Sequence, residues 1–192
     1  MDEYDFLNRI LDQHYLSPNP EQLEEEGVQT AEIITKPGDK GLEGYSLYRY
    51  SLIEEDFLPF FNDNHDTAPK DLKSFCDYIL LVPYRGTLYV MLIELKKNND
   101  TVKVQIDATR QFLDYVISTA ERIKDKNKVS FDSDKIKMIR IKLRGIPVKN
   151  STKHRNDLSY EKSEDLYTYK SKKFDILYVC DYYERNKDKI IQ

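Results

Sequence analysis

The sequence has no long apolar run and very few cysteines. Nowhere do about eighteen apolar residues follow one another, so we expect no transmembrane helix and no membrane partner. The acidic start, MDEYDF, lacks the basic and then apolar layout of a signal peptide. Cys76 and Cys180 are the only cysteines, and neither has the C-x-x-C or His spacing of a zinc site. These absences predict a reducing, cytoplasmic location without structural zinc.

Internal repeats are also absent, and neither sign of charge is in large excess. The 192 residues suit one domain, residues 1–192, with a sizeable core. The net charge of −4 gives no reason by itself to expect nucleic acid. However, residues 1–66 hold sixteen acidic and four basic residues, whereas residues 135–155 hold eight basic residues and no acidic one. An acidic protein can present one basic face, although a solvated charge run is the alternative.

Residues 74–97, SFCDYILLVPYRGTLYVMLIELKK, predict a β-hairpin that contains charged residues. Two apolar, β-rich runs flank the turn cluster PYRG. A tight turn centred on the Arg-Gly pair places Asp77 opposite Glu94, with their Cβ atoms about 4.5–5.5 Å apart. Lys96 lies two residues beyond Glu94 and therefore points to the same face of its strand.

Charges inside an apolar hairpin are costly unless they have a partner or a function. Facing carboxylates repel each other unless a cation lies between them. Mg²⁺ (or Mn²⁺) is the natural cation, because Mg²⁺ prefers oxygen ligands and is often held by one or two carboxylates together with substrate phosphates. A lysine beside the metal would position water or stabilise charge that builds up on phosphorus. A hairpin with edge charges and a chance E-x-K is the alternative.

Asp77, followed after sixteen residues by Glu94-x-Lys96, resembles the motif of the PD-(D/E)XK nuclease superfamily. The likeness covers residues 45–143, and Cys76 stands where the motif has proline. The resemblance implies a restriction-endonuclease-like core of one helix, a three-stranded meander, a second helix and a further strand. It also implies that Asp77 and Glu94 bind a divalent metal and that Lys96 assists phosphodiester hydrolysis, mostly of DNA.

The resemblance implies two further site residues. Members of the superfamily add a third acidic residue, usually from the first helix, and the candidates here are Glu24, Glu25, Glu26, Glu32 and Glu54. Some branches carry a glutamine near the site on the second helix, and Gln105 resembles that catalytic element. The alternative for Gln105 is a glutamine that bonds only to the helix backbone.

Basic residues in two segments are candidates for contacts with nucleic acid. On the helix predicted after the hairpin, two of them share one flank, where an ordinary solvated flank is the alternative. In the strand that follows, Arg140, Lys142 and Arg144 alternate with inward-facing apolar residues and so share one face. Lys149, Lys153 and Arg155 come after them in a polar segment. The candidates are Lys103, Arg110, Arg140, Lys142, Arg144, Lys149, Lys153 and Arg155.

Apolar periodicity and turn residues predict the remaining elements. We expect residues 20–27 to form one or two helical turns and residues 29–35 to be a short strand or the end of that helix. The second long helix begins at an N-cap formed by Asp100 or Thr101. The expected elements are helices over residues 3–15 and 101–124, strands over residues 45–53, 75–82, 87–95, 137–143 and 174–180, a mobile loop over residues 149–165, and a frayed or helical tail from residue 185.

The expected fold is α/β, with a restriction-endonuclease-like core and a mixed, mainly antiparallel sheet flanked by helices. The expected function is Mg²⁺-dependent hydrolysis of nucleic-acid phosphodiesters, with DNA as the favoured substrate and a homodimer left open. The alternative is a catalytically inactive module of the same fold that binds DNA or a partner protein in a defence or repair complex.

Overall fold

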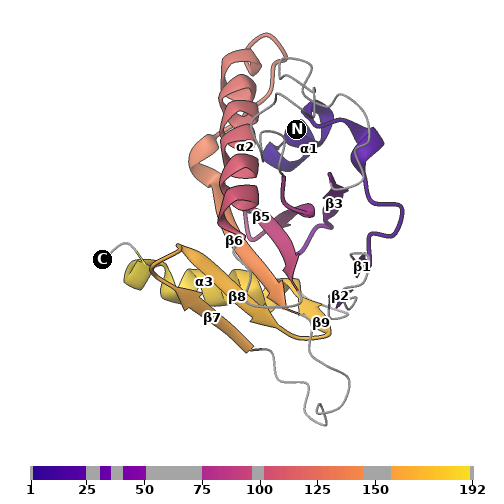
Figure 1. Ribbon diagram of the computed structural model, residues 1–192. Helices are drawn as coiled ribbons and strands as arrows, with labels where there is room; N and C mark the ends of the chain where they lie inside the picture. The colour runs from indigo at the N-terminus through magenta and orange to yellow at the C-terminus, as the bar shows by residue number, and fades with distance from the viewer. Residues whose placement is uncertain are drawn as a thin grey trace, which may run out of the picture.

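The computed structural model describes residues 2–24, 31–35, 41–50, 75–96, 102–144 and 157–190. Within them, helices cover both faces of a central sheet (Figure 1). The helices are α1 (Glu3–Ile10), α2 (Lys103–Ile123) and α3 (Ile176–Ile190), with the 3-10 turns η1 (Gln13–Tyr15) and η2 (Ser133–Lys135). The strands are β1 (Gln22–Leu23), β2 (Ala31–Ile34), β3 (Ser46–Arg49), β4 (Tyr78–Tyr84), β5 (Thr87–Lys96), β6 (Ile136–Arg144), β7 (Asp157–Glu161), β8 (Leu166–Lys170) and β9 (Lys173–Asp175).

The central sheet has the strand order β3-β4-β5-β6-β8-β7. Strands β3, β4 and β5 form an antiparallel meander, in which Arg85 and Gly86 make the last turn with φ of 51° and 75°. Positive φ at both central residues is typical of a type I′ hairpin turn. The chain then crosses over through α2 and returns as β6, parallel to β5. Strand β8 lies parallel to β6, and β7 pairs antiparallel with β8.

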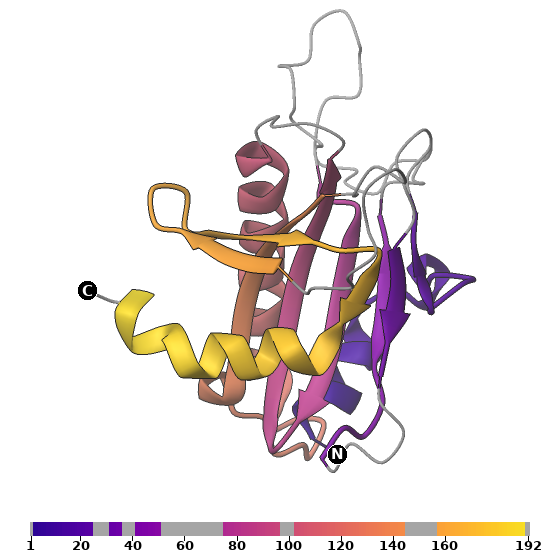
Figure 2. The ribbon, with the colours of Figure 1, turned by 90° about the horizontal axis from the view of Figure 1, so that it is seen from below.

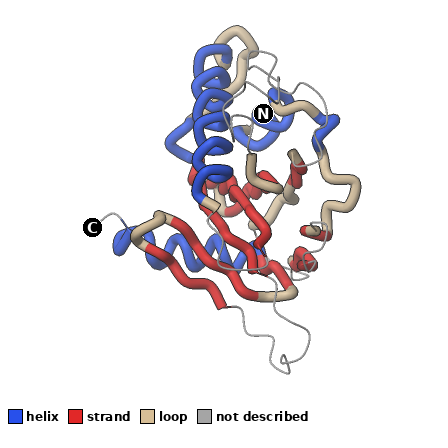
Figure 3. The backbone as a smooth tube through the Cα atoms, viewed as in Figure 1, coloured by secondary structure: helices blue, strands red, loops and turns tan. Residues whose placement is uncertain are grey.

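A second, smaller sheet has the order β1-β2-β9. Together with α3 it packs on one face of the central sheet, whereas α1 and α2 pack on the other (Figure 2). Figure 3 shows the same layers coloured by helix and strand. The predicted α/β class with a mixed, mainly antiparallel sheet is therefore confirmed.

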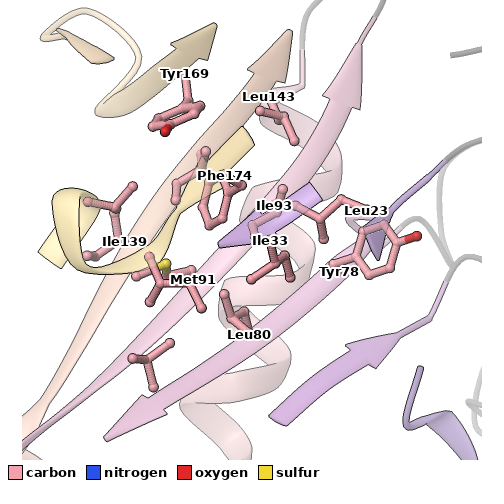
Figure 4. Close-up of a cluster of buried hydrophobic side chains, with 14 of the residues drawn as sticks. Leu23, Ile33, Tyr78, Leu80, Met91, Ile93, Ile139, Leu143, Tyr169 and Phe174 are labelled. Atoms are coloured by element: carbon pink, nitrogen blue, oxygen red, sulfur yellow. The ribbon is translucent and has the colours of Figure 1, made fainter. Parts of the chain in front are cut away.

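Side-chain alternation along the central strands divides the core in two. Along β5, Met91 and Ile93 belong to the cluster on the α3 side, which we call the α3-side core (Figure 4). Val90 and Leu92 point the other way, into the α2-side core. Because successive strand residues face opposite sides of a sheet, this alternation identifies the face on which every polar residue of these strands lies.

Helix α2 matches the predicted apolar stripe. Its buried residues recur at helical spacing and pack on the sheet: Ile106, Thr109, Leu113, Val116 and Ala120. The predicted N-cap is wrong, because the helix is capped by Val102 without a side-chain hydrogen bond, while Asp100 and Thr101 lie outside the described residues. Among the described residues, no helix has the length and apolarity needed to cross a membrane.

The strand predicted over residues 174–180 is wrong for most of its length. Strand β9 ends at Asp175, and α3 begins at Ile176. A seven-residue apolar run is too short to show whether its period is that of a strand or of a helix. Packing decides, because α3 buries Ile176, Val179 and Cys180 in the α3-side core.

Several boundaries also differ from the prediction. The first helix ends at Ile10, and a 3-10 turn replaces its last part. Residues 22–23 form a strand rather than a helical turn, and residues 31–34 are also a strand. The loop predicted over residues 149–165 contains β7, which pairs with β8. The strand predicted over residues 45–53 is confirmed as β3, although residues 51–53 lie outside the described residues.

Candidate active site

The predicted hairpin register is confirmed. Tyr84 pairs with Thr87 and Tyr78 pairs with Ile93, so the next step outward brings Asp77 level with Glu94. Glu94 follows Val90 and Leu92 in the alternation of β5, which places it on the α2 side of the sheet. Asp77 lies on the same side by the same alternation along β4, since Ile79 belongs to the α2-side core.

The carboxylates of Asp77 and Glu94 each accept a hydrogen bond from the backbone of the opposite strand. The backbone N–H of Asp77 donates to Oε2 of Glu94 at 3.1 Å, and the backbone N–H of Leu95 donates to Oδ2 of Asp77 at 2.7 Å. Asp77 is only 6% exposed and Glu94 only 3%. Backbone donors therefore hold two buried carboxylates side by side at the open end of the hairpin.

Lys96 supplies a cation to this pair. Its Nζ lies 2.7 Å from Oε1 of Glu94, and its side chain keeps 20% of its surface exposed. The charge of Glu94 is therefore balanced inside the protein, while the ammonium group still reaches the surface. The structure thus brings together the three residues of the predicted motif.

Lys142 lies beside Glu94 on the next strand. The parallel pairing of β5 and β6 matches Glu94 with Lys142, and both side chains are on the α2 side. Lys142 shares a face of β6 with Arg140 and Arg144, as predicted, but it is only 8% exposed, which leaves little of it for contact with nucleic acid. The register continues to Thr168 on β8, which is also buried. We call Asp77, Glu94, Lys142 and Thr168 the polar row.

Two residues closer to the C-terminal end of β5 and β6, the register of the strands aligns three cations. Lys96 pairs with Arg144, and Arg144 pairs with Lys170 of β8. All three follow the alternation of the polar row, so their side chains lie on the α2 side. We call these residues the cation row. Lys170 is not among the residues that the sequence predicts for the site, because the parallel pairing of β6 with β8 depends on distant segments and has no local sequence pattern.

Cys76 and Thr109 connect the acidic pair to α2. The backbone N–H of Cys76 donates to Oγ1 of Thr109 at 2.8 Å, and that hydroxyl donates to the carbonyl oxygen of Gln105. Burial is the main reason that the pKa of the Cys76 thiol rises to about 12, and the charges of Glu94 and Asp77 also raise it. The thiol is therefore neutral near pH 7 and is not a thiolate nucleophile. Gln105 lies half-buried in the first turn of α2.

Two of the other predicted nucleic-acid contacts, Arg110 and Arg140, have acidic partners and line one cavity. Arg140 pairs with Asp107 of α2 and, at 3.3 Å, with Asp165. Arg110 pairs with Asp114 at 3.9 Å, and both arginines line a cavity of about 320 Å³ together with Asp114 and Asp165. Lys137 lines the same cavity, so two carboxylates accompany three cations there. Lys103 is exposed at the start of α2. The last three candidates lie outside the described residues: Lys149, Lys153 and Arg155.

The third acidic residue is not identified among the described candidates. The backbone of Glu24 exchanges hydrogen bonds with the hydroxyl of Tyr78, whose ring lies in the α3-side core, on the face away from Glu94. Glu32 is exposed in the small sheet, 4.0 Å from Lys173. The remaining candidates, Glu25, Glu26 and Glu54, lie outside the described residues. Within the described ranges, no three His, Cys, Asp or Glu side chains form a group that would hold a metal.

The acidic pair nevertheless has the chemistry of a divalent-cation site. Carboxylate oxygens are preferred ligands of Mg²⁺, which often takes only one or two of them and completes its shell with water and phosphate oxygens. Each carboxylate oxygen can accept more than one contact, and those of Asp77 and Glu94 accept hydrogen bonds from backbone N–H groups and an ion pair from the Lys96 ammonium group. Comparison of the chain with models of protein families, with curated proteins and with solved structures gives no match.

Proposed function

We propose that this protein is a metal-dependent nuclease that hydrolyses phosphodiester bonds of nucleic acid, with DNA as the expected substrate. The observation that carries the proposal is the buried pair Asp77 and Glu94, held on one face of the sheet by hydrogen bonds to each other's strand. Two adjacent buried carboxylates are unfavourable for folding alone and are useful as ligands of a cation.

The order of the elements supports the same proposal. Helix α1 precedes the antiparallel meander β3-β4-β5, and α2 then leads to β6, parallel to β5. The core of the PD-(D/E)XK superfamily has this succession of helix, meander, helix and strand. We therefore propose a restriction-endonuclease-like core, in which β1 and β2 are an insertion between α1 and the meander.

In this proposal each side chain of the motif has a separate role. Asp77 and Glu94 would hold Mg²⁺ or Mn²⁺, which when bound supplies a Lewis acid and an activated water. The ion pair with Glu94 keeps the ammonium group of Lys96 at the surface of the site. There its charge stabilises negative charge that builds up on a phosphate oxygen. Gln105 stays a candidate for positioning through its place in the first turn of α2.

A catalytically inactive module that binds DNA or a partner protein is the second candidate, and one observation favours it. Lys96 bonds to Glu94, and the buried Lys142 is the register partner of Glu94, so two cations already accompany the two carboxylates. Such a cluster is close to neutral without a metal. Metal binding therefore distinguishes the two candidates most directly.

Cleavage and metal binding should be measured together. Supercoiled plasmid and labelled RNA are incubated with the protein in Mg²⁺, in Mn²⁺ or in EDTA, and Mn²⁺ binding is followed by calorimetry. Glu94→Gln and Lys96→Ala should lower cleavage by at least about 100-fold, whereas the control Glu32→Gln, an exposed carboxylate of the small sheet, should not. A wild-type protein that neither binds Mn²⁺ nor cleaves either substrate would reject the nuclease and favour the inactive module.

The cysteines support a proposed cytoplasmic location. Cys76 and Cys180 are both free and buried. They lie in the α2-side and α3-side cores respectively, with the sheet between them, so they cannot form a disulfide with each other. Free thiols of this kind are typical of a reducing compartment.

A further inference from the structure

We propose that the phosphate backbone of the nucleic acid crosses the strands of the sheet along the cation row, Lys96, Arg144 and Lys170. The basic stripe that the sequence predicted runs along one strand, β6, whereas this row runs across β5, β6 and β8. The inference rests on the proposed function for the identity of the ligand, and it adds the path that the ligand takes and a residue, Lys170, that contacts it.

The register fixes the geometry of the row. Neighbouring strands are about 4.8 Å apart, so Lys96 and Lys170 are separated by about 10 Å with Arg144 between them. Lys96 is also the partner of Glu94, so one end of the row touches the acidic pair. A phosphodiester bond at that end would thus have its neighbouring phosphates within reach of Arg144 and Lys170.

The two other basic residues on this face of β6, Arg140 and Lys142, lie beside carboxylates. Arg140 is held between Asp107 and Asp165, and Lys142 is buried beside Glu94. Each member of the cation row is half-buried, so its stem is supported by the sheet while its charged end can meet solvent. Lys170 of β8 pairs with Asp157 of the edge strand β7, so the row ends beside an acidic residue.

A row of this kind recognises phosphate rather than bases. Lysine and arginine contacts to phosphates fix the register of the strand and carry no sequence information. They release counterions, so each contact adds about 0.7 to 0.9 to the slope of log affinity against log salt concentration. The row therefore predicts binding that tolerates any sequence and weakens with salt.

The test measures binding in EDTA, where cleavage cannot interfere. Fluorescence anisotropy of labelled single-stranded and duplex oligonucleotides is recorded from low to moderate salt for Lys170→Gln and Arg144→Gln. The matched control is Lys137→Gln, which removes a lysine from β6 on the opposite face of the same sheet. We expect each row variant to bind about threefold more weakly or worse and to lose about 0.7 to 0.9 of the salt slope. The control should match the wild type, and thermal melts verify that all three variants are folded.

The outcomes separate this inference from the proposed function. If the wild type cleaves in Mg²⁺ but both row variants keep its affinity and salt slope, the path is wrong and the nuclease stands. If the row variants lose binding while the wild type never cleaves, the path stands and the nuclease is wrong. A control that weakens binding as much as the row variants would overturn the inference, because a general loss of positive charge would then explain the effect.

Discussion

Asp77 donates a backbone hydrogen bond to the carboxylate of Glu94, and the carboxylate of Asp77 accepts one from the residue after Glu94, Leu95. The two acidic side chains therefore close the open end of the β4-β5 hairpin. Their repulsion and their hydrogen bonds have opposite effects on stability. Variants that change charge and hydrogen bonding separately can distinguish these two effects.

Asp77→Asn should leave the metal-free protein as stable as the wild type or more stable. The amide oxygen can still accept the N–H of Leu95, and the repulsion between two carboxylates is lost. Asp77→Ala should instead lower the free energy of unfolding by about 1–3 kcal/mol, because the N–H of Leu95 would be left buried without an acceptor. Urea unfolding in EDTA measures both. Equal, large losses in the two variants would mean that the charge of Asp77 itself stabilises the fold.

Lys96→Met should destabilise the protein by about 1–3 kcal/mol, because it removes the cation that bonds to a buried carboxylate. Adding Glu94→Gln to this variant should recover part of the loss, since no carboxylate charge would then remain beside the missing lysine. A double-mutant cycle from urea unfolding measures the coupling. Additive effects of the two substitutions would show that the Lys96–Glu94 ion pair contributes nothing to stability.

Lys142→Met should increase the affinity for Mn²⁺ while lowering the stability of the metal-free protein. A cation next to Glu94 repels a bound divalent ion, and at an effective dielectric constant of about 20 such a repulsion exceeds 1 kcal/mol, or roughly tenfold in affinity. Calorimetric titration with Mn²⁺ measures the change, and Lys137→Met, on the opposite face of β6, is the control. Unchanged or weaker Mn²⁺ binding would show that Lys142 does not lie in the field of the metal site.

The stability of the protein should fall as the pH rises above about 9. Burial raises the pKa of Cys76 from 9.0 to about 12, and it raises the pKa of Tyr48 and Tyr160 from 10.0 to about 12. The unfolded chain loses these protons at the ordinary values, whereas the folded chain holds them. Their contribution is therefore fully present below pH 9 and is lost as the pH rises toward 12.

Thermal melts between pH 7 and pH 11 test this prediction, and absorbance at alkaline pH reports tyrosine ionisation directly. Tyrosine ionisation should be delayed in the native protein relative to the protein in denaturant. A melting temperature that stays constant up to pH 11 would contradict the prediction.

The sequence by itself determined the hairpin and its polar pair. The tight Arg85-Gly86 turn allows a single pairing of the flanking strands, and period-two alternation then places Asp77 and Glu94 on one face. The apolar stripe of α2 was equally predictable, because a helix of 21 residues repeats its period several times. Both signals are local, since each depends on residues close together in the chain.

The tertiary structure alone brought Lys142 beside the acidic pair and Lys170 beside Arg144. Lys142 and Lys170 come into register with Glu94 and Arg144 through parallel pairings between strands that are far apart in the sequence. It also decided that Ile176 begins a helix, because the seven-residue run around it is compatible with either period and only packing in the α3-side core selects one. Parallel register and burial depend on contacts between distant segments, and no local pattern of residues specifies them.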